Sequence, residues 1–178
     1  KTNAVQEARK GRTARFVSDP DFFWDLDNEI NRHANKASKL GLNACVRLNG
    51  TSDIDWIKAT AFAGSLFGKW AGVQFYDYTK SFVRMMEFLT AKDYPRNYHL
   101  TFSRSELNDD QCETVLAHGG NVAAVFDTVP DTFRGRPVVC GDDSDLRFLD
   151  PKGVWVGLTA KGKLRQNASP FKADALTA

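Results

Sequence analysis

Charged side chains recur in this sequence at the points where apolar runs end. "VQFYDYTK" brings Asp77 and Lys80 after one such run, and "VAAVFD" ends in Asp127. Carboxylates in such positions can act as an acid/base pair, attack an anomeric carbon, or hold a hard cation such as Mg²⁺. We expect catalytic carboxylates at Asp53, Asp77 and Asp127. We expect ligand-binding side chains at Arg47, Asn49, Lys80, Ser103, Arg104, Ser105, Asp142, Asp143, Asp145 and Lys161.

The three candidate catalytic carboxylates are not equivalent. Asp77 and Asp127 follow apolar residues directly, which the preference of aspartate for turns explains poorly. Asp53 follows "CVRLNGTS", and either it or Ser52 could instead cap the helix that we expect next. We therefore take Asp77 and Asp127 as the best pair. The stretch "GDDSD", residues 141–145, is also an ordinary polar turn, so a structural role stays open for it.

Two stretches carry groups that suit phosphate. "FSRSE" places the guanidinium of Arg104 between two serine hydroxyls, and "GLTAKGK" brings Lys161 beside Gly162. Guanidinium groups, hydroxyls and backbone amides are the usual protein contacts of phosphate oxygens. Neither stretch is specific alone, but together they predict a nucleotide or a nucleic acid as the partner.

The elements that must position these residues alternate along the chain. Alternation of short apolar runs with helical periodicity is typical of βαβ units and a parallel sheet. The fold class predicted is α/β, with a mostly parallel sheet that forms a partial or complete β/α barrel. In such folds the polar groups at the carboxyl ends of the strands meet at one edge. We expect strands over residues 44–50, 73–78, 98–103, 122–127, 137–141 and 154–160, and helices over 20–40, 52–68, 79–90 and 109–120.

Composition points to one globular domain over residues 1–178. The chain is 42% hydrophobic and 26% charged, and its net charge of +2 gives no overall basic signature. Basic residues do gather at the two ends, residues 1–17 and 161–178, which we expect to be extended and suited to a polyanion. No apolar stretch is long enough to cross a bilayer, so we expect no membrane association. The three cysteines, Cys45, Cys112 and Cys140, lack zinc-site or disulfide spacing, which favours a reducing cytosol.

Longer motifs carry a resemblance to a known family. The stretches "RLNGTSDIDW", "VQFYDYTK", "NYHLTFSRSE" and "VVCGDDSDLRFLDPKGVWVGLTAKGK" resemble the gene-product-88-like family of phage and mobile-element proteins, and "EARKGRTARFVSD" fits its early helical segment. The resemblance covers nearly the whole chain and implies the cytoplasm of a bacterial host. Relatives carry a cysteine-rich segment, similar to an iron–sulfur site, and we expect this chain, which starts at Lys1, to begin after it.

The resemblance leaves several functions open. The family is distantly similar to β/α-barrel enzymes that exchange or modify bases in nucleic acid, which is an analogy of fold. The leading hypothesis is therefore base modification or glycosyl transfer on a nucleotide or nucleic acid. A non-catalytic module that binds nucleic acid or a host protein is the first alternative. The second is the substrate-binding part of an iron–sulfur or radical enzyme. No cofactor is required by these residues, although Mg²⁺ or an upstream cluster would fit the hypotheses.

Overall fold

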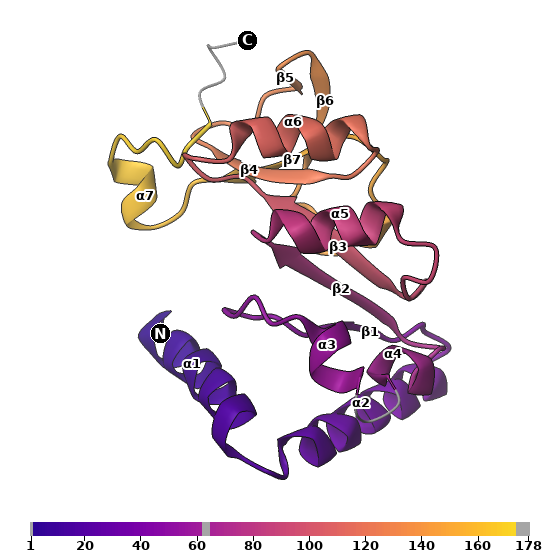
Figure 1. Ribbon diagram of the computed structural model, residues 1–178. Coiled ribbons are helices and arrows are strands. Elements are labelled where there is room, and N and C mark those ends of the chain that lie inside the picture. Colours follow the sequence, from indigo (N-terminus) through magenta and orange to yellow (C-terminus); the bar gives the residue numbers. More distant parts are fainter. Residues whose placement is uncertain (1, 62–64, 174–178) are drawn as a thin grey trace. The chain divides into compact units, whose positions relative to one another are not determined.

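The computed structural model describes residues 2–61 and 65–173, with the side chains of residues 2, 3, 5, 6 and 9 left aside (Figure 1). Contacts divide the chain into two compact units. Unit 1 comprises residues 1–75 and 95–98, and unit 2 comprises residues 76–94 and 99–178. The prediction of a single domain stays a prediction, because two compact units can belong to one folding domain. Each unit is described by itself below.

Unit 1 is built mainly from helices around an aromatic cluster. Phe16 lies edge-on to Phe22, at 5.6 Å between ring centroids, and equally close to Trp56. These contacts join three helices, because the rings come from the end of the first, the start of the second and the start of the third. Asp27 joins the second helix to the fourth by accepting hydrogen bonds from Lys69 Nζ and Trp70 Nε1. The elements are α1 (Thr2–Ser18), α2 (Phe22–Lys39), β1 (Cys45–Arg47), α3 (Trp56–Thr60) and α4 (Leu66–Lys69).

The expected helix over residues 52–68 differs from what the structure shows. Two short helices, α3 and α4, occupy this stretch, and residues 62–64 between them lie outside the described residues. The cap of α3 is Asp55, whose side chain accepts a hydrogen bond from the Lys58 amide at 3.2 Å. The prediction of a cap at Ser52 or Asp53 is therefore wrong. The Ser52 hydroxyl instead donates to Asn49 Oδ1.

A mixed α/β arrangement with a mostly parallel sheet confirms the predicted fold class. The strand order is β1-β2-β3-β4-β7-β6-β5, and closure into a barrel stays a prediction. β4 pairs in parallel with β3 and β7, and β6 pairs in parallel with β7, whereas β5 and β6 form an antiparallel hairpin that the sequence did not predict. The strands are β2 (Gln74–Thr79), β3 (Tyr98–Ser103), β4 (Val122–Phe126), β5 (Thr132–Phe133), β6 (Arg136–Cys140) and β7 (Trp155–Thr159).

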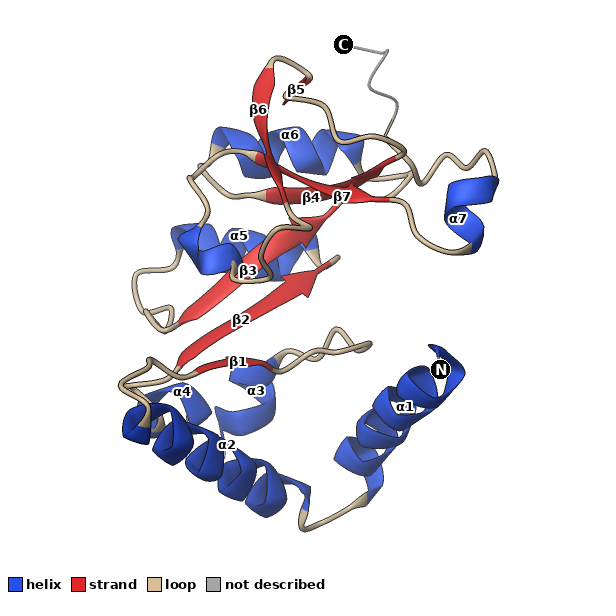
Figure 2. Cartoon of the chain, turned by 180° about the vertical axis from the view of Figure 1, so that it is seen from behind, coloured by secondary structure: helices blue, strands red, loops and turns tan. Residues whose placement is uncertain are grey.

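Helices of unit 2 cover one face of its strands. Figures 1 and 2, which view the chain from opposite sides, both place α5 (Phe82–Thr90) and α6 (Asp109–Ala117) on the same face. Phe133 packs edge-to-face against both Phe126 and Trp155, with ring centroids 5.2 and 5.0 Å apart. All three side chains are almost completely buried, so they anchor β4 and β7 as the rigid centre of the unit.

The two basic ends both contain helices. Residues 2–18 form α1, in agreement with the early helical segment that the family resemblance implies, and the expectation of an extended N-terminal end is wrong there. The C-terminal end forms the short helix α7 (Lys163–Gln166) and then returns to β4, where Lys172 bridges Val125. Lys1 and residues 174–178, also included in the predicted basic ends, lie outside the described residues. No helix in the part of the chain that the structure describes is long and apolar enough to span a membrane.

Candidate functional site

Three neighbouring strands of unit 2 end in a charged residue. Lys80 directly follows β2, Arg104 directly follows β3 and Asp127 directly follows β4. Since β2, β3 and β4 are adjacent in the sheet, these residues lie along one stretch of its edge. We call these three residues the strand-end site. The structure thus brings together one residue from each of three stretches that the sequence had singled out.

Arg104 is held in place by a carboxylate from the following helix. Its side chain is only 8% exposed, and Nε donates to Asp109 Oδ1 at 2.8 Å. Arg134 Nη2 donates to the other oxygen of Asp109 at 2.7 Å. Partial burial raises the pKa of Asp109, but the hydrogen bonds from Arg104 and Arg134 outweigh this effect and hold the pKa below its usual value. Arg104 is therefore a fixed cation rather than a mobile surface side chain.

The serines on either side of Arg104 belong to a structured turn. Asn108 organises this turn, because its Oδ1 accepts from the Ser105 amide at 2.7 Å and its Nδ2 donates to the Ser103 carbonyl at 3.0 Å. The Ser105 hydroxyl accepts from the Leu107 amide. These contacts explain the "SRSEL" sequence as loop chemistry, and the predicted ligand-binding role of Ser103 and Ser105 stays a prediction.

Residues 169–173, which we call the strap, lie against the strand-end site. Lys172 Nζ donates to both carboxylate oxygens of Asp127, at 2.9 and 2.8 Å. Arg104 Nη1 donates to the carbonyl oxygens of Pro170 and Phe171, the shorter of these distances being 3.1 Å. The ammonium group of Lys80 lies 5.3 Å from the centre of the Phe171 ring. All three members of the site therefore contact the strap.

A second charged pair joins the ends of β6 and β7. Asp142 accepts hydrogen bonds from Lys161 Nζ at 2.7 Å and from the Thr159 amide at 2.8 Å. The hydrogen bond from Lys161, followed by those from Thr159, lowers the pKa of Asp142 to about 2. The ion pair between Asp142 and Lys161 thus connects the ends of β6 and β7. Asp143 and Asp145 are exposed, and Asp145 accepts a hydrogen bond of 3.4 Å from the Tyr76 hydroxyl.

Asp77 is not at the edge that its position in the sequence suggested. It lies inside β2, two residues before the strand ends, and its exposed fraction is 0%. The expected strand over residues 73–78 already contained Asp77, and β2 runs one residue further, to Thr79, so Asp77 lies within the strand and not beyond its end. Asp127 has a side chain that is 63% exposed, so of the two preferred carboxylates only Asp127 is accessible in this structure.

The remaining candidates belong to unit 1. Asn49 is 2% exposed, and its Oδ1 accepts hydrogen bonds from Ser52, Ile54 and Trp56, so its amide holds the loop that follows β1. Arg47 and Asp53 are exposed, and Arg47 Nε donates to the Asn49 carbonyl at 3.3 Å. Asn49 thus has a structural role, and the predicted roles of Arg47 and Asp53 stay predictions.

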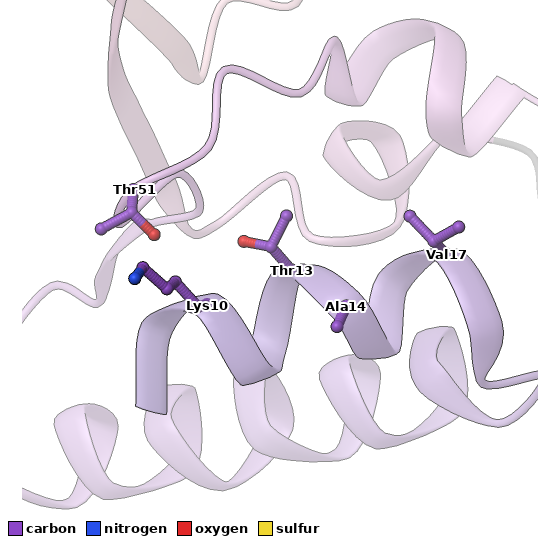
Figure 3. Close-up of a pocket in the computed structure, with 5 residues that line it drawn as sticks. All are labelled: Lys10, Thr13, Ala14, Val17 and Thr51. Carbon is purple, nitrogen blue, oxygen red and sulfur yellow. The ribbon is translucent and has the colours of Figure 1, made fainter. Parts of the chain in front are cut away.

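A surface cavity of about 460 Å³ lies in unit 1 between α1 and the same loop (Figure 3). Its lining consists of Lys10, Thr13, Ala14, Val17 and Thr51. Lys10 is an exposed cation that already contacts Glu7, and Val17 is 80% exposed. The cavity is therefore an open groove, and it is lined by none of the candidate catalytic or ligand-binding residues named from the sequence.

Unit 2 also buries a charged pair away from the strand-end site. Arg147 is 1% exposed, and its Nη1 lies 3.4 Å from Asp150 Oδ2. Burial is the main cause that lowers the pKa of His99 to about 4, and the charge of Arg147 adds to it. His99 is therefore neutral at physiological pH, as expected for a core histidine.

The donor side chains decide whether a metal ion or an iron–sulfur cluster fits the described residues. Within residues 2–61 and 65–173, no three His, Cys, Asp or Glu side chains are grouped to hold a metal ion. Cys45, Cys112 and Cys140 are free thiols on separate elements, and Cys112 is fully buried. These donors do not fit an iron–sulfur cluster or a carboxylate cage for Mg²⁺. A cluster held upstream of these residues stays an expectation.

Family membership follows from a match that spans almost the whole chain. A family model described as Gene product 88 matches residues 1–174. The chain belongs to the Gene product 88 family. This confirms the resemblance drawn from the sequence motifs. Searches of the curated proteins and of the solved structures returned no match to the chain.

Sequence reasoning missed several residues that shape the site of this Gene product 88 protein. Asp109 stands in the first turn of α6, where the helix dipole favours a negative charge, and it also fixes Arg104. Arg134 stands in an unpredicted turn before β6, and its backbone has a φ of 47°. Phe171 and Lys172 follow the last predicted strand, in a stretch without periodicity. No local pattern distinguishes these contacts, since they join segments far apart in the sequence.

Proposed function

We propose that the strand-end site of unit 2 binds a phosphate-bearing ligand, either a nucleotide or a nucleic acid. The observation that carries this proposal is the placement of Lys80, Arg104 and Asp127 at the ends of adjacent strands. Polar ligands of open α/β sheets bind beyond the carboxyl ends of the strands, which is where these residues lie. The name of the family, Gene product 88, specifies no activity.

The two cations of the site differ in a way that suits phosphate. Arg104 is fixed by Asp109 and turns one nitrogen, Nη1, toward the edge of the sheet. Lys80 is exposed, and its ammonium group lies over the Phe171 ring. A fixed guanidinium supplies a directional hydrogen bond, and an ammonium supplies a compact positive charge. Together they can hold one phosphate or two successive phosphates of a strand.

Asp127 is the carboxylate best placed for chemistry on such a ligand. It is accessible and lies beside Arg104 in strand order, whereas Asp77 is completely buried. A carboxylate at this position could take a proton from an attacking group or attack the anomeric carbon of a nucleoside, which would release the base. Base modification or glycosyl transfer therefore remains the catalytic form of the proposal.

A non-catalytic binding module is the second candidate, and one observation favours it. Three carboxylates at this edge are engaged by a cation in the free protein: Asp127 by Lys172, Asp109 by Arg104, and Asp142 by Lys161. A carboxylate whose oxygens already accept two hydrogen bonds is a poor base until that contact breaks. Binding requires no such change at Asp109 or Asp142.

Fluorescence anisotropy with a labelled single-stranded oligonucleotide tests the proposal. A length of about 12 nucleotides lies within the range that a single domain covers. Binding should weaken in Lys80→Ala, and the slope of log affinity against log salt should fall by about 0.7 for one lost phosphate contact. Lys152→Ala is the matched control, because Lys152 is exposed but precedes β7 and so lies at the opposite edge. Equal losses in both variants, or no binding by the wild type, would contradict the proposal.

The reacting carboxylate is tested separately with Asp127→Asn. The catalytic form predicts that this variant binds the oligonucleotide but no longer releases or alters a base, as followed by mass spectrometry of the products. The binding form predicts no product from either protein, together with equal or tighter binding by the variant, since a negative charge near phosphate has been removed. Product formation by Asp127→Asn at the wild-type rate would exclude Asp127 as the reacting group.

A further inference from the structure

The strap contacts the strand-end site through the same atoms that a phosphate-bearing ligand would need. Arg104 directs Nε and Nη2 to Asp109 and Nη1 to two carbonyl oxygens of the strap. Both oxygens of Asp127 accept hydrogen bonds from Lys172. The Phe171 ring lies under the ammonium of Lys80. The chain's own segment therefore fills the place assigned above to the ligand.

The strap is attached to the sheet by a short contact rather than by a full strand. Its only backbone pairing with β4 among the described residues is the bridge between Val125 and Lys172, with a 2.7 Å hydrogen bond from the Ala173 amide to the Val125 carbonyl. On the opposite side of β4, five residue pairs join it to β7. A single backbone hydrogen bond contributes little net stability, so the backbone pairing between the strap and β4 can open without disturbing the sheet.

We propose that the strap regulates the strand-end site by occupying it in the free protein and withdrawing when a phosphate-bearing ligand binds. This inference rests on the function proposed above. Phosphate oxygens accept hydrogen bonds from a guanidinium more strongly than neutral carbonyl oxygens do, so a ligand can replace Pro170 and Phe171 at Arg104 Nη1. Withdrawal of Lys172 then leaves the Asp127 carboxylate unpaired beside the bound ligand.

The apparent affinity of a ligand falls in proportion to the fraction of molecules whose site is open. A substitution that weakens the strap without touching the site should therefore strengthen binding. Ala173→Pro is such a change, because proline lacks the amide that donates to Val125. Ala173→Ser is the matched control, since it keeps this amide and a similar size. Loss of one hydrogen bond of ordinary strength corresponds to about a fivefold gain in affinity.

The experiment compares oligonucleotide binding by the full chain, Ala173→Pro and Ala173→Ser. About fivefold tighter binding by Ala173→Pro alone supports regulation by the strap. Binding of equal strength by all three proteins overturns the strap proposal and leaves the proposed function standing. Absence of binding by every protein overturns both.

Amide exchange of the wild-type protein gives a second readout that does not depend on the folding of a variant. Exchange in a peptide that covers residues 169–173 should become faster when the oligonucleotide saturates the protein, because the Ala173 amide loses its partner. A peptide from β7 serves as the internal control and should not change. Unchanged or slower exchange of residues 169–173 at saturation would overturn the withdrawal of the strap.

Discussion

Replacing Asn49 tests whether this residue has a structural or a ligand-binding role. Its side chain is 2% exposed and accepts hydrogen bonds from the Ser52 hydroxyl at 2.8 Å and from Ile54 N and Trp56 Nε1 at 3.1 Å. Its Nδ2 donates to the Ile54 carbonyl at 3.1 Å. One buried amide thus closes the loop from β1 to α3 and holds the indole of Trp56.

The size of the effect follows from these contacts. Asn49→Ala removes four hydrogen bonds and leaves the buried indole nitrogen of Trp56 without its acceptor. Each intramolecular hydrogen bond contributes about 1 kcal/mol net, and a buried donor left unsatisfied costs about 1–3 kcal/mol. Because water can reach part of the loop, we expect the free energy of unfolding to fall by about 3 kcal/mol rather than by the full sum.

Urea denaturation followed by tryptophan fluorescence measures this loss. Asp53→Ala is the matched control, since Asp53 is exposed in the same loop and its replacement should change the free energy of unfolding by less than about 0.5 kcal/mol. Suppose that Asn49→Ala lowered the free energy of unfolding by less than about 1 kcal/mol and that the variant also bound the oligonucleotide more weakly. The structural interpretation would then be wrong, and the ligand-binding role predicted from the sequence would hold.

Three further predictions concern unit 2. Asp142→Asn should lower the free energy of unfolding at pH 7 by about 1–2 kcal/mol, after a discount for solvent exposure. The pKa of Asp142 in the folded protein is lowered to about 2, mainly by the hydrogen bond from Lys161. The carboxylate therefore stabilises the wild type fully above about pH 4, and this stabilisation is lost as the pH falls through about 2. Urea denaturation should show the stabilities of the two proteins converging there. Gly157→Ala should cost about 1–3 kcal/mol in the same assay, because the added Cβ would lie 2.4 Å from a methyl group of Val129. In the folded protein Cys112 should resist iodoacetamide at pH 8 while exposed Cys140 reacts, because burial raises the pKa of the Cys112 thiol to about 12, and mass spectrometry of tryptic peptides checks this.

The strands of unit 2 could be predicted from the sequence because their signal is local. The expected strand over residues 98–103 coincides with β3. The one over 122–127 is longer than β4 by one residue at its end, and the one over 154–160 is longer than β7 by one residue at each end. These strands are apolar on both faces and bounded by turn residues, which is what a buried parallel sheet requires. The hairpin of β5 and β6 was missed, since β5 has only two residues and gives no periodicity.

The roles of the polar residues depended on contacts that no local pattern contains. Asn49 and Asp77 share the composition of a strand-end motif, yet both are buried. Burial is decided by how far the strand continues and by what packs over the loop, which is information about tertiary structure. Arg104 and Asp127 were placed correctly because each directly follows the last residue of a strand whose boundaries the sequence did define.

The ion pairs at the sheet edge connect the binding and catalytic forms of the proposed function. With the strap in place, Lys172 neutralises Asp127, and the carbonyls of Pro170 and Phe171 occupy Arg104. A ligand that replaces the two carbonyl oxygens at Arg104 removes hydrogen bonds that hold the segment carrying Lys172. The same exchange would therefore admit the ligand and free the only accessible carboxylate of the preferred pair, Asp77 and Asp127. In the catalytic form, exposure of the reacting group would be coupled to arrival of its substrate. In the binding form, the freed Asp127 would repel phosphate and limit affinity. Replacement of Asp127 by asparagine therefore distinguishes the binding form from the catalytic form.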